Sequence, residues 1–273
     1  MSIWIGNGVP TAGGEEVPPA PFAASGLTVM SIDWAADHVV YVTTTGGRHA
    51  IARVLPGQPT PEDVVSAGFG VRASPDGRTI VYQVAGQGGT SDGLWKADAD
   101  GRNAVQLVKG SDGNFPLITP DNRYVVFQST RLSPWIVPIG GGTATQVANV
   151  FYLGLGADVR RSPGGASLVF RSIDAQGQPM VLMCDLPACT KRRTLNLPAG
   201  HLHWTPDGRG VAYIDGATRQ NIWVQPLDGG APRQLTHFTD RSVADFAWSR
   251  DGTRFAVARA TVTNDIVLFK GLR

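Results

Sequence analysis

A turn signature of the form Ser/Thr-Pro-Asp-Gly recurs along the chain at nearly constant spacing. Four clear copies are GVRASPDGRTIVYQ from Gly70, FPLITPDNRYVVFQS from Phe115, HLHWTPDGRGVAYID from His201 and DFAWSRDGTRFAVAR from Asp245. Two diverged copies are IDWAADHVVYV from Ile32 and ADVRRSPGGASLVFRS from Ala157. The turn positions are separated by 39, 45, 43, 43 and 44 residues and are Asp37, Asp76, Asp121, Gly164, Asp207 and Asp251. This period identifies a repeat architecture and constrains the fold more than any other feature.

Each repeat has room for four short strands. In the turn, proline presets φ, aspartate bonds its own backbone two residues on, and glycine accepts a positive φ. The strand after the turn (TIVYQV, YVVFQS, RFAVAR) is apolar almost without alternation, as expected for a sheet covered on both faces. A third-strand element follows and reads IARVLPG at Ile51, LWKADADG at Leu94, PWIVPIGGG at Pro134, VLMCDLPA at Val181, IWVQPLDGG at Ile222 and IVLFKG at Ile266. A last short strand such as PRQLT at Pro232 completes the unit.

These repeats predict an all-β chain, a six-bladed β-propeller with four antiparallel strands per blade, as one domain over residues 1–273. The 34 glycines and 19 prolines agree, because they favour short strands joined by tight turns. SIWIGNG at Ser2 resembles a further third-strand element, whereas IVLFKG is followed by no fourth strand. We therefore expect the ring to be closed by an N-terminal strand from residues 1–25, either Glu15 to Phe22 or the Ile3 segment.

Charge and hydropathy exclude some classes of partner. The formal net charge is +2 and the 24 Lys and Arg residues are scattered, so we expect no nucleic-acid binding. No apolar run approaches the roughly 20 residues of a transmembrane helix, and MSIWIGNGVPTAGG does not have the pattern of a signal peptide. We expect a chain that does not insert into a membrane and is a monomer, although a targeting signal or anchor upstream in a longer parent stays possible.

The repeat resembles a known family. WTPDG…VAYID, LWKADADG and IWVQPLDGGAPRQLT are similar to the WD40-like (PD40) propeller repeat of the TolB family, over nearly the whole chain. The segment NIWVQPLDGGAPRQLTHFTDRSVADFAWSRDGTRFAVARATVTNDIVLF resembles the extracytoplasmic propeller of acidobacterial serine/threonine protein kinases. That resemblance implies a bacterial parent with a cytoplasmic module, one membrane span and a propeller on the outer side.

Signatures of catalysis are missing from the sequence. It contains no Gly-rich phosphate loop, H-R-D catalytic loop or D-F-G; the nearest string, Asp245-Phe246-Ala247, belongs to a repeat strand. It also lacks the G-x-S-x-G elbow of the serine hydrolases that accompany some propellers. We therefore predict no enzyme activity. A propeller lyase or hydrolase acting on carbohydrate or peptide is the alternative.

His201 and His203 are the most distinctive polar residues of the repeats. They lie two apart on a predicted inner strand, so both face the same side while Leu202 and Trp204 face the other. They are candidates for the lining of the central channel, or for plain structural positions. Two imidazoles could begin a metal site, but zinc needs a third or fourth ligand, so we predict no metal and no cofactor. The remaining histidines, His38, His49 and His237, fall in different repeats.

Arginines also fall on predicted inner strands. Arg72 and Arg160, with Arg161 beside them, are candidates for a ligand-binding channel lining together with the two histidines. A positive lining would attract an anionic ligand or an acidic peptide end. A register slip of one residue would reverse the side that these residues face.

Tryptophans and turn aspartates recur at fixed phases of the repeat. Recurrence at one phase predicts packing between blades for Trp34, Trp204 and Trp248 and for Trp95, Trp135 and Trp223, with a sugar-binding platform as the alternative. The turn aspartates occur one per blade, so we interpret them as turn formers and not as a catalytic carboxylate pair.

Cys184 and Cys189 flank a predicted turn in MCDLPACTKRR. Across a hairpin they lie at bridgeable distance, so we predict a disulfide; a reduced pair in a cytosolic protein is the alternative. A disulfide fits the extracytoplasmic (periplasmic) location implied by the resemblance. The predicted function is a non-catalytic sensor or interaction domain that binds a protein or small molecule at the channel mouth, with a purely structural scaffold as a further alternative.

Overall fold

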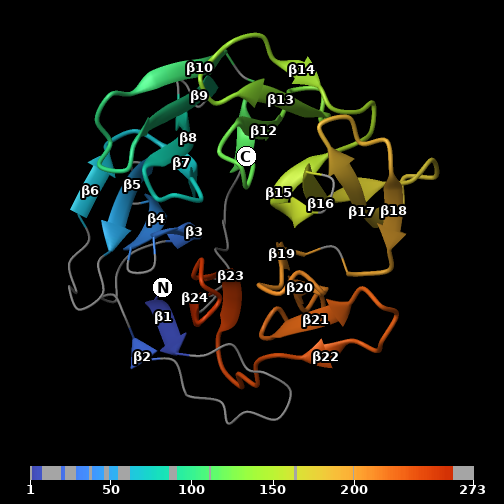
Figure 1. The fold of residues 1–273 in the computed structure, drawn as a ribbon. Helices are drawn as coiled ribbons and strands as arrows, with labels where there is room; N and C mark the ends of the chain where they lie inside the picture. The colour runs from blue at the N-terminus through green and yellow to red at the C-terminus, as the bar shows by residue number, and fades with distance from the viewer. Residues whose placement is uncertain are drawn as a thin grey trace, which may run out of the picture.

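The computed structural model describes residues 2–7, 20–21, 29–36, 39–45, 49–54, 62–85, 91–110, 112–162, 165–198 and 200–260. Throughout these residues the regular secondary structure is β-strand, arranged as six antiparallel sheets of four strands. The sheets lie around a common centre, with β3, β7, β15 and β23 near it and β6, β10, β18 and β22 at the periphery (Figure 1). No helix in this part of the chain has the length and apolar character needed to cross a membrane.

We number the sheets in chain order by their innermost strand. Sheet 1 contains β3 (Val29–Ala36), β4 (Val39–Thr45), β5 (His49–Val54) and β6 (Glu62–Val65). Sheet 2 contains β7 (Phe69–Ala73), β8 (Thr79–Ala85), β9 (Ser91–Asp98) and β10 (Val105–Lys109). Sheet 3 contains β11 (Asn114–Ile118), β12 (Tyr124–Gln128), β13 (Pro134–Pro138) and β14 (Thr145–Gln146).

The second half of the chain repeats this arrangement. Sheet 4 contains β15 (Leu153–Ser162), β16 (Gly165–Ile173), β17 (Pro179–Leu186) and β18 (Arg192–Leu195). Sheet 5 contains β19 (Leu202–Trp204), β20 (Gly210–Ile214), β21 (Ile222–Pro226) and β22 (Arg233–Gln234). Sheet 6 contains β23 (Ser242–Trp248) and β24 (Arg254–Ala260), joined by β1 (Ser2–Asn7) and β2 (Ala20–Pro21).

Sheet 6 is built from both ends of the described chain. β1 pairs antiparallel with β24, from Ser2 opposite Arg259 to Asn7 opposite Arg254, and β2 pairs with the other edge of β1. The Ile3 segment, as β1, and Ala20–Pro21 of the second candidate segment therefore both belong to this sheet. The IVLFKG element at Ile266 lies outside the described residues, as do the turn positions Asp37 and Gly164.

The hairpin turns between the first two strands of each sheet have the predicted chemistry where they are described. Thr205 Oγ1 donates to Asp207 Oδ1 at 2.6 Å, and the Arg209 N–H donates to the same oxygen at 3.0 Å. Gly208 follows with a φ of 65°. The same pair of hydrogen bonds occurs at Asp76, Asp121 and Asp251. These aspartates are turn formers.

The apolar core lies between neighbouring sheets. Val125 and Phe127 of β12 pack in one cluster with residues of sheet 2, whereas Val126, between them, packs in another with residues of sheet 4. Successive residues of a strand point to opposite faces, so a strand buried on both faces needs apolar residues at every position. Trp95, Trp135 and Trp223 pack against such clusters, in agreement with the packing role predicted for them.

Candidate functional site: the central channel

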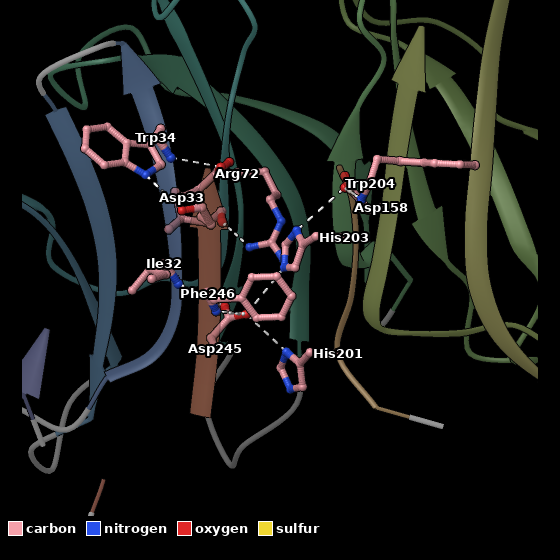
Figure 2. Close-up of polar contacts among 12 residues, drawn as sticks. Ile32, Asp33, Trp34, Arg72, Asp158, His201, His203, Trp204, Asp245 and Phe246 are labelled. Atoms are coloured by element: carbon pink, nitrogen blue, oxygen red, sulfur yellow. Dashed lines mark hydrogen bonds and ion pairs between the residues drawn. The ribbon is translucent and has the colours of Figure 1, made fainter. Parts of the chain in front are cut away.

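The two histidines of the fifth repeat share one side of the chain, as predicted. Leu202 and Trp204, which alternate with them, are buried at 0% and 5% exposure. His201 Nδ1 lies 3.2 Å from Asp245 Oδ1, and His203 Nε2 lies 3.5 Å from the same oxygen. Figure 2 shows both imidazoles directed from sheet 5 toward Asp245 on β23. The two side chains therefore join sheet 5 to sheet 6.

His203 also reaches the sheet on its other side. Its Nδ1 lies 3.6 Å from Asp158 Oδ2 on β15, and its ring meets Phe246 edge-on with centroids 4.6 Å apart. Both distances to carboxylates exceed the usual hydrogen-bond length, so these contacts are ion pairs. Burial lowers the pKa of His203, but the carboxylates of Asp158 and Asp245 outweigh it and raise the pKa to about 9. His203 thus has a partly buried imidazole whose protonated form is favoured by two carboxylates.

The carboxylates themselves are anchored by backbone N–H groups. Asp245 is fully buried, and its Oδ2 accepts a hydrogen bond of 3.1 Å from the Ile32 N–H of sheet 1. Burial raises the pKa of Asp245, but the two histidines outweigh it and hold that pKa well below its usual range. Asp158 Oδ2 accepts from the Trp204 N–H at 2.8 Å. We call His203, Asp158 and Asp245 the clasp, because they connect sheets 4, 5, 6 and 1.

A third carboxylate has a similar place between sheets 1 and 2. Asp33 Oδ2 accepts from the Ala73 N–H at 2.9 Å, and its Oδ1 accepts from the Trp34 N–H at 2.9 Å. Burial raises the pKa of Asp33, and the neighbouring positive charge of Arg72 opposes that increase. The Arg72 guanidinium also donates to the Val71 carbonyl at 3.0 Å. Arg72 lines a cavity together with Asp33, and the ligand-binding role that the sequence suggested for it stays a prediction.

The side chains of the clasp are engaged mainly with one another. Both nitrogens of His203 face carboxylates, so neither is available to accept a proton from a substrate. Asp245 Oδ1 is shared by His201, His203 and the Phe246 N–H. Among the described residues, no three or more His, Cys, Asp or Glu side chains are arranged to hold a metal ion. These contacts fix the orientation of the side chains and place charged groups along the wall of the channel.

The clasp separates two cavities along the channel. On the side of the hairpin turns, a mouth cavity of about 330 Å³ is lined by Asp33, Asp158 and His203 and by four arginines, Arg72, Arg160, Arg161 and Arg250. On the other side, His201 and Asp245 line a cavity of about 70 Å³ with Phe115 and several glycines. Arg72 and Leu117 line both cavities.

Arg160 and Arg161 extend the mouth cavity outward along β15. The Arg160 guanidinium lies over the Trp204 ring at 4.6 Å from its centroid. Arg161 Nη2 is 3.4 Å from the Pro120 carbonyl of sheet 3. With His203 protonated, the mouth has five cationic side chains against two carboxylates, and both carboxylates already accept backbone hydrogen bonds. The cavity therefore has a positive potential.

The predicted disulfide is present at the outer edge of sheet 4. Cys184, at the end of β17, is bonded to Cys189 in the following turn, with Cα atoms 5.0 Å apart. Both residues are buried, at 2% and 1% exposure. The other described histidines do not join this cluster: the His49 ring lies 5.5 Å from the Phe69 ring at an interplanar angle of 50°, and His237 is exposed.

Sequence reasoning placed the cations of the channel but missed their partners. Asp33, Asp158 and Asp245 were not recognised as channel residues. One feature of the sequence could have identified them: each is an acidic residue within a predicted inner strand, directly after an apolar residue. The three pairs are Ile32-Asp33, Ala157-Asp158 and Ala244-Asp245. An ionisable residue in a strand expected to be buried needs a partner, and here the partners are histidines, an arginine and backbone N–H groups.

Comparison with solved structures supports the fold. A TolB candidate from Agrobacterium tumefaciens superposes with a TM-score of 0.65 at 20% identity, over 96% of this chain and 98% of that one. TolB from Acinetobacter baumannii gives 0.64 at 15% identity, over 90% of this chain and 57% of that one. The tricorn protease gives 0.62 at 14% identity, over 85% of this chain and 24% of that one. No family model and no curated protein matches the sequence. The fold is that of a TolB-like β-propeller.

Proposed function

We propose that this TolB-like β-propeller is a non-catalytic binding domain that takes an acidic segment of a protein partner at the mouth of its channel. The observation that carries the proposal is the charge of the mouth cavity. Arg72, Arg160, Arg161 and Arg250 line a space of about 330 Å³, with the His203 imidazolium at its base. Carboxylate groups are the natural ligands of such a surface, because guanidinium groups bind them with two parallel hydrogen bonds.

The clasp supports this function indirectly. It holds sheets 4, 5, 6 and 1 through ion pairs and backbone hydrogen bonds, which favours a fixed arrangement of Arg160 and Arg161 on β15 and of Arg250 in the turn of sheet 6. A rigid site loses little conformational entropy when a ligand binds. The carboxylates of Asp33 and Asp158 accept backbone N–H groups, which weakens their competition with an acidic ligand for the arginines.

We infer in addition that the six sheets are the blades of one closed ring spanning residues 1–273, with β1 as the closing strand, and that the chain acts as a monomer. The pairing of β1 with β24 supports the closure, because it joins the N-terminal segment to the last repeat. Closing a ring in this way leaves few exposed sheet edges.

We further propose an extracytoplasmic location, as the sensor or interaction domain of a membrane-anchored bacterial regulator such as a serine/threonine kinase. The disulfide between Cys184 and Cys189 supports the location, because disulfides persist mainly in oxidising compartments. The resemblance of residues 221–269 to kinase-linked propellers supports the parent. Intact mass after alkylation, with and without reductant, tests the bridge in protein isolated from its native compartment. Two freely alkylated thiols without reductant would argue against this location.

The binding proposal is tested with a fluorescein-labelled hexaglutamate peptide, followed by fluorescence anisotropy. We expect Arg161→Glu with Arg250→Glu to weaken binding at least tenfold, because both exposed arginines line the mouth. The control is Lys109→Glu with Lys191→Glu, which changes the net charge equally at exposed positions outside that cavity. Binding should also weaken with added salt. Equal weakening by both pairs, or no binding to the parent chain, would refute the proposal.

A further inference from the structure

A cavity outside the channel lies between sheets 5 and 6, on the side of the hairpin turns. Its volume is about 370 Å³, and its apolar wall consists of Pro206, Val224, Pro226, Leu235 and Trp248. Val224 and Leu235 are buried at 3% and 2% exposure, so the wall is the edge of the core between the two sheets. Small-molecule sites in proteins begin at about this volume and are mostly apolar with a few polar groups.

A difference between the repeats explains why the cavity exists. In the turns of sheets 2, 3, 5 and 6, the Ser or Thr accepts the N–H that opens the second strand. In sheet 6 this residue is Arg254, and in sheet 5 it is Gly210. The Arg254 guanidinium covers the Trp34 ring of sheet 1 at 5.0 Å from its centroid. Gly210 has no side chain to place over Trp248, the tryptophan at the same repeat phase in sheet 6. Gly210 and Trp248 line the cavity together.

The tryptophan between sheets 4 and 5 reinforces the comparison. Trp204 is covered by Arg160 of the preceding sheet at 4.6 Å from its centroid. Trp34 and Trp204 are therefore each stacked against an arginine of the sheet before them and are buried at 3% and 5% exposure. Trp248 is only half-buried, in the wall of a cavity. A flat group placed there would stack on the indole as the guanidinium groups do elsewhere.

The charged residues at this cavity favour a negatively charged ligand. Arg209 and Arg233 are exposed at its rim, and the one carboxylate is Asp207. Asp207 is engaged by the Thr205 hydroxyl and the Arg209 N–H within its own turn. Two guanidinium groups against one occupied carboxylate leave a net positive charge beside an apolar wall.

We propose that this cavity binds a small planar carboxylate, an aryl or indolyl acid, with its ring against Trp248 and its carboxylate between Arg209 and Arg233. The apolar wall accepts the ring, and the two arginines recognise the charge. This site shares Thr205 and Pro206 with the mouth cavity but none of the arginines that line it, and neither proposal depends on the other.

Isothermal titration calorimetry of the full chain with 2-naphthoate tests the site, with 2-naphthamide as the uncharged probe. We expect the amide to bind at least tenfold more weakly, because it lacks the charge that the arginines recognise. Arg209→Ala with Arg233→Ala should weaken naphthoate binding at least tenfold. Arg78→Ala with Arg123→Ala is the matched control, since these arginines follow the turn aspartates of sheets 2 and 3 as Arg209 does in sheet 5. The control should leave the dissociation constant within twofold.

A second variant tests the comparison between repeats. Gly210→Arg installs the residue that sheet 6 has at this position and should abolish naphthoate binding by covering Trp248. A Cβ at Gly210 would lie 2.9 Å from Val224 Cγ1, so circular dichroism must first establish that the variant folds. If it does not fold, the arginine pair and the amide probe still decide the question.

The proposal would be overturned if naphthoate did not bind at about 1 mM, if the amide bound equally well, or if the Arg209/Arg233 variant bound naphthoate equally well. Hexaglutamate binding should be unchanged in that double variant, so failure here is distinct from failure at the mouth.

Discussion

Near the centre of the molecule, neighbouring sheets are connected by hydrogen bonds of two chemical kinds. Between sheets 2 and 3 and between sheets 3 and 4, a neutral amide accepts a backbone N–H: Gln83 Oε1 from Phe115 at 3.1 Å and Gln128 Oε1 from Gly154 at 2.8 Å. Between sheets 1 and 2, 4 and 5, and 6 and 1, the acceptor is a carboxylate at 2.8 to 3.1 Å. The amides lie on the second strands β8 and β12 and the carboxylates on the inner strands β3, β15 and β23, so the two kinds of contact differ in position as well as in charge.

This difference in charge determines which contacts need a cationic side chain nearby. A buried amide that accepts one hydrogen bond needs no counter-charge, whereas a buried carboxylate is costly unless it is paired. Accordingly His203 lies between Asp158 and Asp245, and Arg72 lies near Asp33. The cations that stabilise the carboxylates also line the channel. The charge of the candidate site is therefore partly a consequence of how these sheets are joined.

The largest expected effect comes from removing the central carboxylate. Asp245→Ala removes one of the two carboxylates beside the partly buried His203 side chain and leaves the Ile32 N–H without its acceptor. We expect the free energy of unfolding to fall by about 3–5 kcal/mol, as when one member of a buried ion pair is deleted. Gln128→Ala at an amide contact is the matched comparison and should cost about 1–3 kcal/mol, the penalty for one unpaired buried donor. Urea unfolding at neutral pH measures both changes.

Equal losses in Asp245→Ala and Gln128→Ala would show that charge adds nothing to the carboxylate contacts. Asp245→Asn is a useful third variant, because its amide oxygen can still accept the Ile32 N–H while the charge opposite His203 is gone. Its loss should fall between those of the two alanine variants.

The carboxylate contacts should also make the stability of the chain depend on pH, whereas the amide contacts should not. The pKa of His203 is raised to about 9 in the folded chain, against 6.5 for a free imidazole. Its contribution is therefore fully present below pH 6.5 and is lost as the pH rises through about 9; a difference of this size corresponds to about 3 kcal/mol. Asp245, whose pKa is lowered, contributes in the opposite sense, and its contribution is lost on acidification.

Chemical denaturation of the parent chain and of His203→Gln across pH 6 to 9.5 measures this term. The variant should lose the alkaline decline that the histidine causes. His237→Gln, at an exposed histidine, is the control and should follow the parent curve. A parent curve that is flat over this range would mean that His203 is not held as an imidazolium.

The sequence predicted the architecture much better than it predicted these contacts. The turn signature has a local physical basis, a hydroxyl and a carboxylate bonding within four residues, so Thr205 and Asp207 could be read directly. The side on which His201 and His203 lie also followed from strand alternation. Their partner did not: Asp245 is 44 residues from His201 and 213 from Ile32, and its contacts depend on how separate sheets pack. The cavity at Trp248 likewise depends on the absence of a side chain at Gly210, which matters only once sheets 5 and 6 are adjacent.

The smallest expected effect tests whether an amide contact can be converted into a carboxylate contact without a cation. In Gln128→Glu, the acid is neutral at low pH and its carbonyl oxygen can still accept the Gly154 N–H, so stability near pH 4 should stay close to that of the parent. Gln128 is buried at 6% exposure, and burial should raise the pKa of the new carboxyl above the ordinary value of about 4.3. A raised acid pKa destabilises the folded chain as the pH rises above the unfolded value, here by about 1–3 kcal/mol at pH 8. This trend is opposite to that of Asp245.

Urea unfolding of the variant at pH 4 and pH 8 measures this effect. Gln128→Leu is the uncharged control, and it separates the loss of the hydrogen bond from the effect of charge. If Gln128→Glu became more stable relative to the parent with rising pH, a buried carboxylate would be tolerated there without His203 or Arg72, and the difference between the two kinds of contact would not be one of charge.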